Sequence, residues 1–137
     1  MILIPENRKK HVFAVAELMY KLAPHEKKEQ MYLLGLLHDI GYIYGPKDHN
    51  KTGGNLLKQS GYQYWQEVYY HGNYAPLYSS YELTLLNYAD MHISPDGKYV
   101  SFEERLEDIK SRYGDTSEEY RNSLNLIKDF KQFFDDV

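Results

Sequence analysis

The feature that most constrains the fold is an acidic residue placed directly after an apolar segment. Residues 31–37 read Met-Tyr-Leu-Leu-Gly-Leu-Leu and are apolar on nearly every side, which predicts a central, buried helix. That segment runs straight into His38 and Asp39. An ionised carboxylate beside such a core costs free energy unless it is paired or coordinates a metal ion. The His-Asp pair therefore predicts a paired or metal-binding carboxylate at the end of a buried helix.

A second apolar segment that leads into an aspartate, and an upstream histidine, add further candidate metal ligands. Residues 83–89 are largely apolar and end in Asp90, while His11 lies in an amphipathic segment, residues 7–23. Together with the His-Asp pair they give two imidazoles and two carboxylates, a donor set that suits a divalent ion. The chain has no cysteine, so nitrogen and oxygen must hold any metal. These donors do not distinguish Fe, Mn, Zn, Ni, Co and Mg.

Two more histidines extend the donor set, because His49 opens one predicted short helix and His71 closes another. The six candidate metal ligands are His11, His38, Asp39, His49, His71 and Asp90. One ion does not need so many ligands, and a natural division is two ions bridged by Asp39, as in sites that activate water. Whether one or two divalent ions bind stays open. His92 is expected at the surface or behind the ligands, because it lies two residues past Asp90 on the same helix.

Apolar residues recur at helical spacing along most of the chain, and no segment reads convincingly as a strand. Gly41 predicts the end of a helix, and the sequence Ser-Phe-Glu-Glu from Ser101 fits a capping box that begins one. The predicted helices span residues 7–23, 25–40, 50–59, 62–70, 79–92 and 101–113, and a last amphipathic helix carries residues 120–134. We therefore expect an all-α fold, one compact domain over residues 1–137 with about seven helices. Its metal-site core spans about residues 8–92, and a C-terminal helical extension spans about residues 99–137.

The order of the candidate ligands resembles that of a known family. A His, then a His-Asp pair, then a distant Asp on an all-α bundle is the signature of the HD superfamily of metal-dependent phosphohydrolases. This chain matches that order over about residues 8–92, ending at Asp90. His49, followed by Asn-Lys-Thr-Gly-Gly, resembles the histidine before a small-residue pair in the bacterial branch that cleaves dinucleoside tetraphosphates. His71 matches the next histidine of that branch.

The resemblance implies a phosphohydrolase that attacks a nucleotide, or another phosphate ester or anhydride, with metal-activated water. Asp39 and His38 are then the catalytic residues, with Asp39 the best candidate to bridge the ions and orient the nucleophile. Many family members continue the His-Asp pair with a small residue and a lysine that suits phosphate, but here Tyr42 stands at that place. Lys51 is a cation close in sequence that can substitute. Tyr42 and Lys51 are therefore the candidate substrate-binding residues.

Two functions of other classes stay open. Di-iron oxygenases of the HD superfamily use the same ligand order, and a tyrosine such as Tyr42 would then have a gating role. That function predicts iron and oxygen-dependent turnover. A non-catalytic domain that binds metal and nucleotide predicts tight ligand binding without turnover.

Composition narrows the expected partners. The net charge is −4 with both signs interspersed, and no basic stripe indicates nucleic-acid binding. No apolar run approaches the roughly eighteen residues of a membrane span, and the N-terminus lacks a signal peptide, which predicts a cytoplasmic protein without a membrane partner. The expected partner is a small phosphorylated molecule, most simply a nucleotide. The tyrosine-rich segment 62–81 is the candidate surface for a homodimer.

Overall fold

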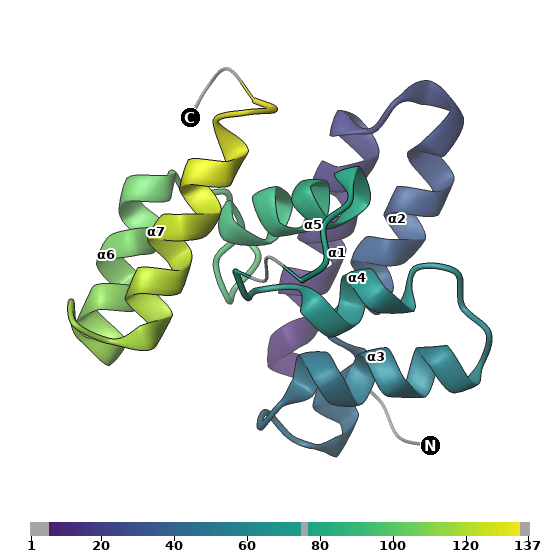
Figure 1. Cartoon of the computed structure of the whole chain (residues 1–137), viewed down its shortest axis with the longest axis horizontal. Coiled ribbons are helices and arrows are strands. Elements are labelled where there is room, and N and C mark those ends of the chain that lie inside the picture. The colour runs from purple at the N-terminus through teal and green to yellow at the C-terminus, as the bar shows by residue number, and fades with distance from the viewer. Residues whose placement is uncertain (1–5, 75–76, 135–137) are drawn as a thin grey trace.

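A computed structural model describes residues 6–74 and 77–134 as an assembly of helices (Figure 1). The elements are α1 (Glu6–Leu22), η1 (His25–Lys27), α2 (Lys28–Leu37), η2 (Ile40–Tyr44), α3 (His49–Gln59), α4 (Trp65–Tyr70), α5 (Tyr81–Met91), α6 (Phe102–Tyr113) and α7 (Glu118–Phe130), where η marks a 3-10 helix. Within these residues the only β-type pairing is an isolated bridge between Ile93 and Tyr99. The all-α prediction is confirmed. No helix in the described ranges has the length and apolar character needed to cross a lipid bilayer.

The first core cluster joins α1, α2 and α5. Met19, Met31 and Leu34 are fully buried within it. The segment 31–37 is nevertheless buried on one face only, not on nearly every side as expected, since Leu33 is 45% exposed. Helices α1 and α2 lie side by side (Figure 1) and approach closely at Gly35, where a Cβ atom would lie 2.5 Å from the Cα of Ala16. This close crossing places His38, the residue after α2, in the buried interior of the molecule.

The predicted helix over residues 25–40 is wrong at its C-terminal end. Helix α2 ends at Leu37, the His-Asp pair forms a turn, and the chain continues in the 3-10 helix η2. Gly41 is not the expected helix stop, because it lies inside η2. A Cβ atom at Gly41 would meet the carbonyl oxygen of His49 at 1.8 Å, so only glycine lets α3 approach this closely.

Helices α6 and α7 form a hairpin on one side of the bundle (Figure 1). A second apolar cluster attaches it to α5 and includes Tyr88, Leu126 and the almost fully buried Phe130. The capping box at Ser101 is confirmed, since its hydroxyl accepts from the N–H of Glu104 and the Glu104 carboxylate accepts from the N–H of Ser101.

His92 is not at the surface, which corrects one alternative of the sequence analysis. It is only 4% exposed, and its ring stacks on Phe102 with the two ring centroids 3.9 Å apart. Its Nδ1 lies 2.7 Å from the carbonyl oxygen of Val100 and donates to it. The hairpin covers this face of α5, which could not be foreseen from the position of His92 on its own helix.

Candidate metal centre

Four imidazole rings from four separate elements meet at the centre of the bundle. His11 lies on α1, His38 directly after α2, His49 at the first position of α3 and His71 directly after α4. Neighbouring rings are T-shaped or tilted relative to each other, with centroids 5.2 to 5.5 Å apart. His49 and His71 lie at helix boundaries, as the sequence predicted, and these positions direct both rings towards the other two.

Each of the four rings is oriented by a backbone carbonyl. The Nδ1 atoms of His11, His38, His49 and His71 lie 3.0, 2.6, 3.3 and 2.5 Å from the carbonyl oxygens of Ser94, Gly35, Pro46 and Val68. A carbonyl oxygen can only accept, so Nδ1 carries a hydrogen in each ring, and when the ring is neutral the lone pair is then on Nε2. This tautomer is the one that a metal-binding histidine needs when Nε2 is the ligand.

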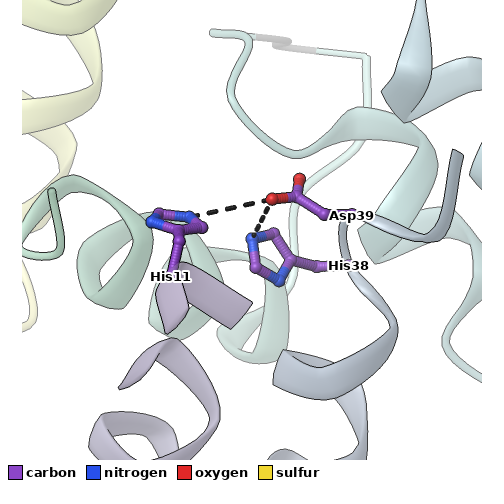
Figure 2. A group of neighbouring side chains, drawn as sticks. All are labelled: His11, His38 and Asp39. Carbon is purple, nitrogen blue, oxygen red and sulfur yellow. Dashed lines mark ion pairs between the residues drawn. The ribbon is translucent and has the colours of Figure 1, made fainter. Parts of the chain in front are cut away.

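The four Nε2 atoms point at two carboxylates, Asp39 at the end of α2 and Asp90 on α5. The Oδ2 atom of Asp39 lies 3.4 Å from Nε2 of His38 and 3.8 Å from Nε2 of His11, as Figure 2 shows. Its other oxygen, Oδ1, lies 3.5 Å from Nε2 of both His49 and His71. The two oxygens of one carboxylate thus face two different pairs of imidazoles.

Asp90 closes the cluster on the side of α1. Its Oδ1 lies 2.8 Å from Nε2 of His11 and 3.5 Å from Nε2 of His38. The side chain of Asp90 is 17% exposed, whereas that of Asp39 is 2% exposed. Asp90 therefore lies at the edge of the cluster and Asp39 at its centre.

The electrostatics of the cluster favour ionised carboxylates and a neutral His49 ring. Burial alone would raise the pKa of the Asp39 carboxyl, but the neighbouring His38 and His71 rings outweigh it and hold that pKa well below its usual range. Burial lowers the pKa of His49, and the nearby His71 lowers it further. An anionic Asp39 and a neutral His49 are the forms that bind a cation.

The residues fit a divalent metal ion. The ligand atoms form three overlapping groups, each with its atoms within 4.8 Å of one another. The groups are His11, His38 and Asp39; His38, His71 and Asp90; and Asp39, His49 and His71. Nε2 of His38 is buried and has no hydrogen-bond partner, although a buried polar atom of this kind is rarely left unsatisfied. A cation at the centre would supply the missing partner.

Arg8 and Tyr42 complete the wall of the cluster. Nη2 of Arg8 donates to Oδ2 of Asp39 over 2.7 Å, and the guanidinium lies 4.6 Å from the centroid of the Tyr42 ring. The Tyr42 ring stacks on His49 with the two centroids 4.3 Å apart. Arg8 precedes His11 by three residues on α1, and this helical spacing is the sequence signal that places both on one face.

A cavity of about 490 Å³ opens over the cluster. Its floor includes Asp39, His49, His71 and Asp90, and Tyr42 lies in its wall, where a substrate-binding residue would be. Lys51 is exposed and is not among the lining residues, so the structure does not bring it to the site. The opposite wall comes from the hairpin and includes Arg105, Asp108, Ile109, Arg112, Tyr113 and Glu119. The ligand motif gave no sign of this wall, because it lies beyond Asp90 in the sequence.

Comparison with known protein families extends the family resemblance beyond Asp90, where the ligand motif ends. The family model described as HD domain matches residues 8–122, which includes all six candidate ligands, α6 and the first part of α7. Searches of curated proteins and of solved structures found no match. The family match spans most of the chain, and the buried His-Asp cluster has the donors that a divalent metal requires. The chain therefore belongs to the HD domain family, within the superfamily of metal-dependent phosphohydrolases.

Proposed function

We propose that this protein hydrolyses a phosphate ester or anhydride, most simply on a nucleotide, with divalent metal held by the histidine–aspartate cluster. The single observation that carries the proposal is the convergence of four Nε2 atoms on Asp39 and Asp90 at the floor of a cavity of about 490 Å³. A cavity of this volume is in the range of small-molecule sites. Membership of the HD domain family supports the same reaction class.

The donor geometry divides naturally around Asp39. His11, His38 and Asp90 would hold one ion together with Asp39, and His49 and His71, which also face Asp39, would hold a second. Divalent ions in such sites lower the pKa of a bound water towards neutrality and stabilise charge on phosphoryl oxygens. Asp39 would hold the two sets of ligands in fixed positions relative to each other, because it faces both.

The protein groups beside the cluster have roles in the same reaction. The oxygen of water forms a bond to phosphorus while the bond to the leaving oxygen breaks, and the leaving oxygen gains a proton that water supplied. Arg8 lies against Asp39 at the cavity wall and can donate to the phosphoryl oxygens as charge develops on them. Tyr42 holds the His49 ring by stacking and narrows the approach to it. Stacking on Tyr42 therefore fixes one ligand ring while leaving the cavity open.

Phosphate release tests this proposal. Metal-free protein would be loaded separately with Mn²⁺, Fe²⁺, Zn²⁺, Ni²⁺, Co²⁺ and Mg²⁺ and incubated with nucleoside mono-, di- and triphosphates and with dinucleoside tetraphosphates. We expect metal-dependent release of phosphate or of shorter nucleotides from at least one class, and none after removal of metal by a chelator. Turnover that requires oxygen and iron would replace the proposal by the oxygenase. Tight nucleotide binding without turnover would replace it by the non-catalytic domain.

A further inference from the structure

Arg105 on α6 is a cation that faces the cavity without a counter-ion. It is half-buried, and Nη1 donates to the carbonyl oxygen of Ile93 over 3.1 Å. Its Nε is buried and has no hydrogen-bond partner, and no carboxylate in the described part of the chain forms an ion pair with it. The two other arginines of the cavity differ, because Arg8 pairs with Asp39 and Arg112 pairs with Asp108.

This arrangement leaves the guanidinium of Arg105 without an ion-pair partner among the described residues of the hairpin wall. A partly buried charge without a partner costs free energy, which an anion in the cavity would recover. Glu119 also lines the cavity, but it is exposed to water and makes no ion pair with Arg105. A planar guanidinium with several free N–H groups is suited to binding a phosphate through two parallel hydrogen bonds.

The position of Arg105 relates it to the metal cluster without making it part of it. Its acceptor, Ile93, donates its own N–H to the carbonyl of Asp90, and the next carbonyl, that of Ser94, orients His11. Arg105 also lines a neighbouring cavity of about 320 Å³, which shares the wall residues Pro95, Asp108 and Arg112 with the larger one. The guanidinium is therefore held beside the segment that carries Asp90, at the junction of the two cavities.

We propose that Arg105 binds a second phosphate of the substrate, one that is not hydrolysed. The substrate class is then a nucleotide or similar molecule with two separate phosphate groups, one over the metal cluster and one against α6. This inference rests on the proposed phosphohydrolase function for the group over the metals. It goes beyond that function by assigning selectivity to a residue of the hairpin.

The test compares two nucleotides that differ in one phosphate, adenosine 5′-monophosphate and adenosine 3′,5′-bisphosphate. Binding of each to the metal-loaded protein is measured by calorimetry, and kcat/KM is measured by phosphate release. We expect the wild type to bind the bisphosphate about tenfold more tightly, the size expected for a hydrogen-bonded charge pair. Arg105→Gln should remove that preference, and Arg105→Lys should retain part of it.

The matched control is Arg121→Gln, which removes an arginine of α7 that is exposed and does not line the cavity. It should keep the wild-type preference. Equal affinity of the wild type for the two nucleotides, or an unchanged preference in Arg105→Gln, would overturn the inference. The wild-type comparison needs no variant, so it holds even if Arg105→Gln does not fold. A binding preference that depends on Arg105, without phosphate release from either nucleotide, would refute the hydrolase and leave the phosphate-binding role intact.

Discussion

At Asp39 one carboxylate is shared among four imidazoles and a guanidinium. Oδ2 contacts Arg8 at 2.7 Å and faces His11 and His38, while Oδ1 faces the two remaining rings at 3.5 Å. With this carboxylate removed, the rings and the guanidinium would have no common anion between them. Asp39 is therefore the residue whose substitution should affect metal binding most.

The first prediction is that Asp39→Ala abolishes both metal binding and phosphate release. We expect a loss of activity of more than about a hundredfold, because loss of a ligand should exceed the effect of losing a residue that only orients one. Metal content and phosphate release would be measured on the same preparation. Asp115→Ala, at an exposed position after α6, is the control and should keep both. Activity that survives when the metal is lost would contradict the mechanism.

The second prediction concerns Tyr78, whose hydroxyl donates to the buried carboxylate of Glu67 over 2.5 Å. Burial and this hydrogen bond raise the pKa of Tyr78 to about 12. A raised pKa in the folded state gives a stabilisation that is complete below the ordinary tyrosine pKa of about 10 and is lost as the pH rises towards 12.

The free energy of unfolding in urea, measured at about pH 9 and about pH 11.5, checks this expectation. The difference between the wild type and Tyr78→Phe should shrink at the higher pH. Tyr44→Phe, at a position that is 65% exposed, is the control and should show no such change. A Tyr78→Phe difference that is the same at both pH values would refute the prediction.

At the level of elements, much of the fold could be predicted from sequence, and the exceptions have physical reasons. Apolar spacing located every long helix, and the capping box at Ser101 gave one helix start. The end of α2 was missed, because the turn at the His-Asp pair depends on α3 approaching Gly41, a contact between separate elements. Buried His92 was missed for the same reason, since α6 and the preceding loop cover it.

For the candidate site too, local features could be predicted from sequence, whereas contacts between separate elements could not. The six ligands could be listed from their residue types and their places at helix ends, and the structure brings all six together. The wall formed by the hairpin could not be foreseen, because charged residues on α6 read as a solvent-exposed face when the partner surface is unknown. Lys51 shows that proximity in sequence does not place a side chain in the cavity, since it lies two residues from His49, is exposed and is not among the lining residues.

The third prediction is that Gly41→Ala weakens metal binding by displacing the start of α3. The added Cβ would lie 1.8 Å from the carbonyl oxygen of His49, so the backbone must shift and the His49 ring with it. We expect a loss of stability of roughly 1–3 kcal/mol or more, together with weaker metal binding. Asn55→Ala, at an exposed position of the same helix, should change neither. Wild-type metal affinity in Gly41→Ala would contradict the role given to this close approach.

For the whole molecule, the hairpin of α6 and α7 is both a structural layer and one wall of the cavity. It is attached through the cluster that contains Tyr88 and Phe130, and the ring of Tyr88 stacks on Phe134 with the two centroids 3.9 Å apart. The family match continues into α7, in agreement with the hairpin being part of the domain that holds the metal cluster.

The fourth prediction follows from that attachment. Phe130 is 1% exposed, so Phe130→Ala should lower the free energy of unfolding by about 3–5 kcal/mol. Phe133 is 56% exposed, and Phe133→Ala should change it by no more than about 0.5 kcal/mol. Urea unfolding of the two variants gives the comparison. Equal effects of the two substitutions would mean that the second apolar cluster does not hold the hairpin in solution.

The central claim, that the histidine–aspartate cluster binds divalent metal, is tested most directly by elemental mass spectrometry. Protein purified without chelator would be compared with Asp39→Ala prepared in the same way. We expect about one or two divalent ions per wild-type chain, according to whether both halves of the cluster are filled, and almost none in the variant. A wild-type chain that carries no metal, even after reloading with Mn²⁺, Fe²⁺, Zn²⁺, Ni²⁺, Co²⁺ or Mg²⁺, would contradict the claim.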